Sequence, residues 1–249
     1  MAIKKLKRVV WRAARPLALQ LLRHTGTFDV TWRSLRKLRD RGLKVQFAVD
    51  GGAATGEWTL AFKKLYRDAQ VLCIEPRDSA QADLQALSKK LSGIHIAQTL
   101  VGDKEGEISF NESEDQSSVL AHSSGKTFGT PKTIAMTTLD KLVTARSLPL
   151  PDLIKLDLQG AELMCLRGAA KCLEHAQAVI LEVNFIPLYK DSPLAADVMA
   201  FMAERGFRCY DILSLWHRPL DGALAFGDMV FIKQGHALLA DSRWSTGTI

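Results

Sequence analysis

The sequence predicts an α/β fold with a doubly wound, mostly parallel sheet, and three observations lead to this prediction. Short apolar runs of strand length alternate five times with helix-like segments, and a final pair of strands follows. A glycine-containing turn follows the first run, within Val45–Gly56, and an acid ends the second, at Glu75. Since parallel strands present their carboxyl ends at one edge of a sheet, the turn and the acid should share a ligand-binding edge.

Seven apolar segments are expected as strands because turn residues or charges bound them. In chain order they are Val45–Val49, Gln70–Pro76, Gly93–Gly102, Asp152–Leu158, Val179–Phe185, Arg208–Leu213 and Met229–Lys233. Helical spacing of apolar residues predicts helices over Thr31–Arg41, Glu57–Tyr66 and Leu194–Arg205, with others after Pro76, Thr138 and Glu162. The polar stretch Asn111–Thr130 is expected to be a long loop, either a lid over a ligand or a disordered segment.

The first turn, VDGGAATG, predicts a nucleotide-binding site. Its glycines let a ligand approach the backbone closely because no Cβ stands in the way. Ala53 replaces the second glycine of the G-x-G-x-x-G pattern that holds a pyrophosphate, and Asp50 would repel one but attract an ammonium group. We therefore expect S-adenosylmethionine (SAM) rather than a dinucleotide, with Asp50, Gly51, Gly52, Ala53 and Gly56 as cofactor-binding residues. An ordinary strand-to-helix turn without a ligand is the alternative.

Two later segments extend this predicted site. Glu75 ends the second strand 25 positions after Asp50, where an acid accepts hydrogen bonds from ribose hydroxyls, and Pro76 follows it. A solvated strand end is the alternative for Glu75. If the strands are placed correctly, Val101 and Gly102 at the end of the third strand lie against the adenine ring.

Charge divides the chain into a basic segment, 1–44, and a larger domain, 45–249. The first 44 residues hold 13 Lys and Arg against two acids, a net charge of +11, and the remainder holds 20 against 25, a net charge of −5. The basic segment reads as two amphipathic helices, which either cap the sheet, touch an anionic membrane or hold nucleic acid. No apolar run reaches membrane-spanning length, and the four cysteines form no C-x-x-C pair. These features predict a cytoplasmic protein, with peripheral membrane contact through residues 1–44.

Five sequence blocks together resemble the FkbM family of SAM-dependent O-methyltransferases. They are Asp50–Gly56, Glu75-Pro76, the Gly102-Asp103…Gly106 turn, Thr138-Leu139-Asp140 and Lys155–Glu162. The last block, KLDLQGAE, is the most distinctive one, and the family pattern there is K-x-D-V-E-G-x-E. The resemblance implies a class I methyltransferase sheet of seven strands, six parallel and one antiparallel, with N-terminal helices added here. It also implies methylation of a hydroxyl on a sugar, glycan or related secondary metabolite.

Three residues are candidates for the base that takes the proton of such a hydroxyl. Asp157, which is also expected to bind the cofactor, comes first because it ends the fourth strand, nearest the expected methyl position. Glu182, at the end of the fifth strand, comes second. His217, in a late loop, is the third. Lys155 alternates to the same face as Asp157, so a structural ion pair between the two is an alternative reading.

Gln159 stands where the family pattern has Glu. If that Glu is a base or a metal ligand, the chemistry of this protein differs, whereas Gln can replace it in a hydrogen bond. The acids show no decisive ligand spacing, so a divalent cation is unsupported and the metal is unassigned. The alternatives are an RNA methyltransferase that uses residues 1–44, a SAM-binding module without turnover, and an NAD-dependent oxidoreductase. The lack of an N-P-P-Y-type sequence and the acidic larger domain count against nucleic acid as a partner, and no sequence feature predicts an oligomeric state.

Overall fold

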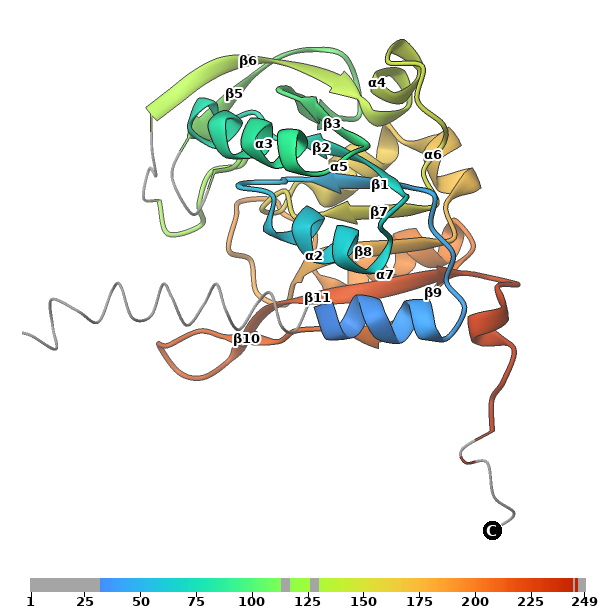
Figure 1. Ribbon diagram of the computed structural model, residues 1–249. Coiled ribbons are helices and arrows are strands. Elements are labelled where there is room, and N and C mark those ends of the chain that lie inside the picture. Colours follow the sequence, from blue (N-terminus) through green and yellow to red (C-terminus); the bar gives the residue numbers. More distant parts are fainter. Residues whose placement is uncertain (1–31, 113–116, 126–129, 244, 246–249) are drawn as a thin grey trace, which may run out of the picture.

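The central sheet has eight strands in the order β10-β11-β8-β7-β1-β2-β3, with β9 also paired to β11 (Figure 1). A computed structural model describes residues 32–112, 117–125, 130–243 and 245. The strands are β1 (Phe47–Gly51), β2 (Gln70–Ile74), β3 (Ile94–Ala97), β7 (Leu153–Leu156), β8 (Ala178–Asn184), β9 (Phe207–Ile212), β10 (Trp216–His217) and β11 (Leu224–Lys233).

The strand directions confirm the predicted class I methyltransferase sheet. Strands β1, β2, β3, β7 and β8 pair in parallel, whereas β11 is antiparallel to β8, β9 and β10. Thus β11 is the antiparallel strand of an otherwise parallel sheet. The two-residue β10 is an eighth strand that the sequence does not predict.

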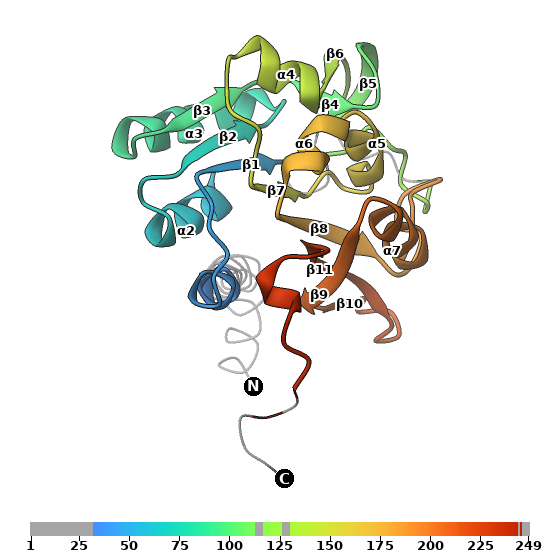
Figure 2. The same ribbon diagram turned by 90° about the vertical axis from the view of Figure 1, so that its right-hand side faces the viewer.

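Helices cover both faces of this sheet, as Figure 2 shows. On one face lie a helix over residues 32–40, α2 (Glu57–Leu65) and α3 (Asp78–Lys90). On the other lie α4 (Leu139–Ala145), α5 (Glu162–Arg167), α6 (Ala170–His175) and α7 (Ala195–Glu204). A 3₁₀ turn, η1 (Ala237–Leu239), follows β11. Each face therefore has its own apolar core, and the molecule has three layers.

The helix over residues 32–40 is part of this layered unit. Leu35 and Leu38, its predicted apolar face, are fully buried and share a core with Val45 and Ala48. This half of the basic segment therefore packs against the sheet domain, as the capping alternative proposes. The earlier predicted helix, up to Gly26, lies outside the described residues.

A second, three-stranded sheet corrects the predicted third strand. Gly93–Gly102 does not form one strand: β3 ends at Ala97, and β4 (Leu100–Gly102) joins β5 (Gly106–Glu112) and β6 (Thr130–Thr138) in the order β4-β6-β5. The reason is that Leu100 buries its side chain against Phe110 and Met136 of this second sheet. The two halves of Gly93–Gly102 therefore belong to different sheets, although the sequence is continuous and largely apolar.

One block of the FkbM-like pattern connects helices. Thr138 caps α4 by accepting a hydrogen bond from the backbone N–H of Lys141, at 3.2 Å. The carboxylate of Asp140 accepts from the backbone N–H groups of Lys171 and Cys172, each at 2.9 Å, in the first turn of α6. This block is therefore structural, because it fixes α4 against the start of α6.

A buried ion pair joins the two central strands. The register places Asp50 of β1 beside Lys155 of β7, and Lys155 Nζ lies 3.0 Å from Asp50 Oδ1. Asp50 is completely buried, and Thr59 of α2 donates a hydrogen bond to its Oδ2 at 2.7 Å. Burial alone lowers the pKa of Lys155, but the carboxylates of Asp50 and Asp157 outweigh this effect and raise it. Lys155 is therefore a fixed cation paired with Asp50.

We expect Lys155→Met to reduce the free energy of unfolding by about 3–5 kcal/mol, because it leaves Asp50 as a buried charge without its partner. Adding Asp50→Asn should restore most of this loss. Urea unfolding followed by circular dichroism measures both effects. As a control, Lys141→Met breaks the exposed pair with Glu105 and should cost less than about 1 kcal/mol. An equally small cost for Lys155→Met would contradict the role given to the buried pair.

Candidate functional site

A cavity of about 230 Å³ lies at the carboxyl ends of β1, β2 and β7, between the central sheet and the second sheet. The sequence-predicted residues Gly52, Glu75, Pro76, Val101 and Asp157 line it. This is the edge at which doubly wound sheets bind their ligands. The predicted edge and the cavity therefore coincide.

The glycine turn is held tightly against the neighbouring strands. Gly52 has a φ of +70°, and a Cβ there would overlap the carbonyl oxygen of Asp157. The backbone N–H groups of Gly52 and Ala53 both donate to the carbonyl of Ile74, at 3.0 and 3.1 Å. In this arrangement Gly52 and Ala54 face the cavity.

The other predicted glycine-turn residues shape the turn without lining the cavity. Gly51 lies on β1, where a Cβ would meet the side chain of Leu156 at 2.6 Å, and Ala53 is buried. Gly56 has a φ of +87° and is the N-terminal cap of α2. Glycine is therefore needed at these positions chiefly for packing and backbone conformation.

The position of Asp50 contradicts its expected contact with a ligand's ammonium group. Its side chain has no exposed surface, does not line the cavity, and is occupied by Lys155 and Thr59. The physical reason is that the chain supplies its own cation to this acid. The alternative pairing of Lys155 with Asp157 is also wrong, since Lys155 Nζ contacts Asp50 and the carbonyls of Gly51 and Gly52.

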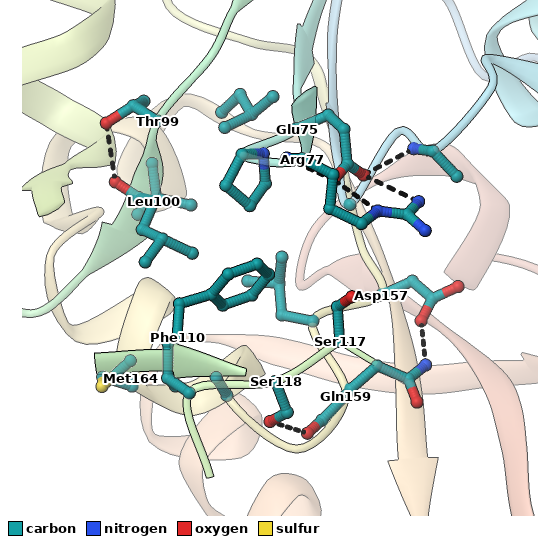
Figure 3. Close-up of a pocket in the computed structure, with 18 residues that line it drawn as sticks. Glu75, Arg77, Thr99, Leu100, Phe110, Ser117, Ser118, Asp157, Gln159 and Met164 are labelled. Atoms are coloured by element: carbon teal, nitrogen blue, oxygen red, sulfur yellow. Dashed lines mark hydrogen bonds and ion pairs between the residues drawn. The ribbon is translucent and has the colours of Figure 1, made fainter. Parts of the chain in front are cut away.

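Glu75 occupies the predicted place at the end of β2, and Pro76 lines the cavity beside it. Its Oε2 accepts a hydrogen bond from the backbone N–H of Ala54 at 2.8 Å. Its Oε1 lies 2.9 Å from Nε of Arg77, and the two side chains are only 4% and 13% exposed (Figure 3). The carboxylate therefore faces the cavity from between the glycine turn and Arg77.

An apolar wall closes the cavity opposite Asp157 and Gln159. It is formed by side chains from β4, β5, α5 and the segment after residue 116, namely Leu100, Val101, Phe110, Val119 and Met164. Gly102, predicted to lie against an adenine ring, does not line the cavity because Met136 packs directly over it. Leu100 and Val101, from the same strand end, do line the cavity.

The side-chain amide of Gln159 bridges the carboxylates of Asp157 and Glu182. Nε2 of Gln159 donates to Asp157 Oδ1 at 2.8 Å and to Glu182 Oε1 at 3.3 Å. The hydroxyl of Tyr189 donates to Oε1 of Gln159 at 2.6 Å, which fixes the orientation of the amide. Ser118 donates to the backbone carbonyl of Gln159 at 2.9 Å, and Gln159 itself has a φ of +53°. Hydrogen bonds from Tyr189 and Ser118 therefore fix both the side chain and the backbone of Gln159.

This edge of the sheet carries more acids than cations. Burial first, and then the nearby carboxylates of Asp157, Glu162 and Asp228, raises the pKa of Glu182 well above its usual range. Burial raises the pKa of Glu162 to about 7, against the opposing effect of backbone N–H donors such as that of Leu158. The excess of carboxylates favours binding of a proton or a cationic ligand here.

His217 does not join this cluster. It lies on the short strand β10, its side chain is exposed, and β11 separates that strand from β8 and Glu182. The reason is that the loop containing Trp216 and His217 folds back onto β11 at the sheet edge. In the part of the chain that the structure describes, no group of three or more His, Cys, Asp or Glu side chains is placed to hold a metal ion.

Several residues of the site give no signal in the sequence. Tyr189 and Phe110 come from segments without a motif, and Arg77 gives no periodic signal, so their positions depend on the folded chain. In the sequence, Gln159 stands out only as a departure from the family pattern. Its bridging role follows from the left-handed turn after β7, which sequence spacing does not reveal.

Crystal structures of several methyltransferases are similar to this chain. One, a methyltransferase FkbM from Methylobacillus flagellatus KT, is 16% identical, with a TM-score of 0.49, over 75% of this chain and 43% of that protein. Magnesium protoporphyrin IX methyltransferase from Synechocystis PCC 6803, with bound SAM, is 12% identical, with a TM-score of 0.49, over 84% of this chain and 79% of the other. The chain thus spans less than half of the Methylobacillus protein. None of the curated proteins matches this sequence significantly.

The family model described as "Methyltransferase FkbM domain" matches residues 50–209. The match begins at Asp50, before the glycine turn, includes the KLDLQGAE block and the Glu182 strand, and covers more than half of the chain. Together with the sheet order and the cavity at the carboxyl ends of the strands, it establishes that the chain belongs to the FkbM family of SAM-dependent methyltransferases.

Proposed function

We propose that this protein transfers a methyl group from SAM to a hydroxyl of a sugar, a glycan or a related secondary metabolite. One observation carries the proposal: a single cavity joins Glu75, an apolar wall and the Asp157–Gln159 pair. Glu75 suits a ribose, the wall suits an adenine ring, and the acids suit both a cationic cofactor and a hydroxyl proton.

Within this proposal, each part of the cavity has a separate task. Glu75 would hold the ribose hydroxyls, while Leu100, Phe110 and Met164 would contact the adenine ring. When bound, SAM supplies an electrophilic methyl group, so the protein has mainly to align an acceptor oxygen and remove its proton. The carboxylate of Asp157 at the cavity wall favours the positively charged cofactor over a dinucleotide, whose pyrophosphate it would repel.

Asp157 is the proposed base. It lines the cavity, whereas Glu182 lies behind it on the other side of the Gln159 amide. As the acceptor oxygen forms its bond to the methyl carbon, the carbon–sulfur bond of SAM would break and leave its electron pair on sulfur, which gives S-adenosylhomocysteine. The O–H electron pair would stay on the oxygen, and the proton would pass to the carboxylate of Asp157. Gln159 keeps this carboxylate oriented, and an amide at this position adds no further negative charge to the cluster.

We further propose that residues 1–44 attach the protein to an anionic membrane surface, where a lipid-linked sugar would be an acceptor. The net charge of +11 in this segment supports the idea. Among the described residues, no helix is long and apolar enough to cross a bilayer. An RNA acceptor is the second candidate, supported by the same charge.

The cofactor assignment predicts stabilisation by SAM and by S-adenosylhomocysteine, but not by NAD. A ligand at about 100 times its dissociation constant adds about 2.7 kcal/mol to the free energy of unfolding. Differential scanning fluorimetry with the three ligands at matched concentration measures the shift. Glu75→Gln should reduce the shift, whereas Glu105→Gln, an exposed acid outside the cavity, should not. Stabilisation by NAD alone would contradict the assignment.

Asp157→Asn should lower the rate of methyl transfer about 100-fold or more, because general base catalysis contributes about 10²–10⁴. The substitution keeps the size of the side chain, so binding of S-adenosylhomocysteine should change little. Formation of S-adenosylhomocysteine with a panel of monosaccharide and glycan acceptors measures the rate, and Asp103→Asn at an exposed turn is the control. Unchanged turnover would transfer the role to Glu182, and no turnover by the wild type with any acceptor would favour a binding module.

Replacing Lys4, Lys5, Lys7 and Arg8 by Gln should weaken sedimentation with vesicles that contain phosphatidylserine, since each basic residue contributes about 1 kcal/mol near an anionic surface. Vesicles of phosphatidylcholine alone should bind neither protein. The matched control replaces four exposed cations of the sheet domain, Lys89, Lys90, Lys104 and Lys171. Salt-sensitive binding to RNA without vesicle binding would favour the RNA alternative.

A further inference from the structure

The carboxylate of Glu75 already accepts four hydrogen bonds from the protein. Oε1 accepts from the backbone N–H of Arg77 at 3.1 Å and from Nε of Arg77 at 2.9 Å. Oε2 accepts from the backbone N–H of Ala54 at 2.8 Å and from Nη2 of Arg77 at 3.4 Å. Since a carboxylate offers about four lone-pair positions, those of Glu75 are filled.

A ribose diol needs two of these positions, one for each hydroxyl. The backbone donors of Ala54 and Arg77 belong to the glycine turn and to the start of α3, so they are fixed. The guanidinium of Arg77 is the part that can leave, because side-chain rotation alone moves it. Its departure would open one position on each carboxylate oxygen and leave both backbone bonds intact. Figure 3 shows this guanidinium beside Glu75 at the wall of the cavity.

We propose that the side chain of Arg77 occupies the hydrogen-bonding positions on Glu75 that the ribose hydroxyls of the cofactor need, and that the vicinal diol must displace it. This inference rests on the proposed function, because it requires an adenosine ligand at Glu75. Arg77 is then a specificity-determining residue. A ligand with two adjacent hydroxyls replaces both N–H donors of the guanidinium, whereas a ligand without them leaves the Arg77–Glu75 pair in place.

Displacement has a cost, because the pair is largely buried. Glu75 and Arg77 are 4% and 13% exposed, and water screens such a pair less than a surface pair. The cofactor must therefore overcome an interaction within the protein before it gains its own hydrogen bonds. Removing the guanidinium should remove this competition, so the wild-type arginine weakens binding in exchange for selectivity.

The test is the dissociation constant of S-adenosylhomocysteine, measured by isothermal titration calorimetry on wild type, Arg77→Ala and Lys132→Ala. Arg77→Ala should bind about threefold to tenfold more tightly, because S-adenosylhomocysteine no longer has to displace charge-assisted hydrogen bonds to Glu75. Lys132 pairs with Asp78 at 3.1 Å and does not line the cavity. Lys132→Ala therefore removes one positive charge nearby and should leave the dissociation constant of S-adenosylhomocysteine unchanged.

The 2′,3′-dideoxy analogue of S-adenosylhomocysteine separates displacement from a general effect of charge. It has no diol, so it should bind wild type and Arg77→Ala equally. Equal or weaker binding of S-adenosylhomocysteine by Arg77→Ala, or an equal gain for the analogue, would overturn the inference while leaving the cofactor assignment standing. Failure of S-adenosylhomocysteine to bind wild type and all variants would overturn the cofactor assignment and this inference with it.

Discussion

The ion pair between Asp50 and Lys155 is the interaction on which the candidate site depends. It joins neighbouring positions of β1 and β7, and Thr59 connects it to α2. These elements carry the glycine turn and Asp157, so the pair sets the distance between the two halves of the cavity edge. A charge pair with no exposure on one side is costly to bury, and this one is compensated by hydrogen bonds from Thr59 to Asp50 and from Lys155 to the carbonyls of Gly51 and Gly52.

The cavity divides its contacts between two sheets. The central sheet contributes the polar groups, whereas the second sheet contributes Leu100 and Phe110 to the apolar wall. At the end of α5, Gly168 packs closely against the second sheet, since a Cβ there would overlap the carbonyl oxygen of Gly102. The position of the apolar wall therefore depends on contacts at α5 and β4 that lie outside the cavity.

Much of the fold follows from local sequence, because five strands are short apolar runs and their helices have clear apolar faces. Leu35 and Leu38, for example, are buried as their spacing predicts. The site was less predictable. Glu75, Val101 and Asp157 line the cavity as expected, because strand ends meet at one edge. Asp50, Gly102 and His217 do not, since their positions depend on a long-range ion pair, on Met136 and on the pairing of β10. Interactions between residues far apart in the chain leave no local pattern.

The acids around Glu182 outnumber the cations, and this imbalance bears on the whole course of the proposed reaction. The site would begin beside a sulfonium cation and end with a proton on a carboxylate. One positive charge would thus replace another within the same few ångströms, so the total charge of the site would stay constant from substrates to products. An edge rich in carboxyl groups is suited to chemistry that exchanges a methyl cation for a proton, because at no stage would it have to accept an additional negative charge.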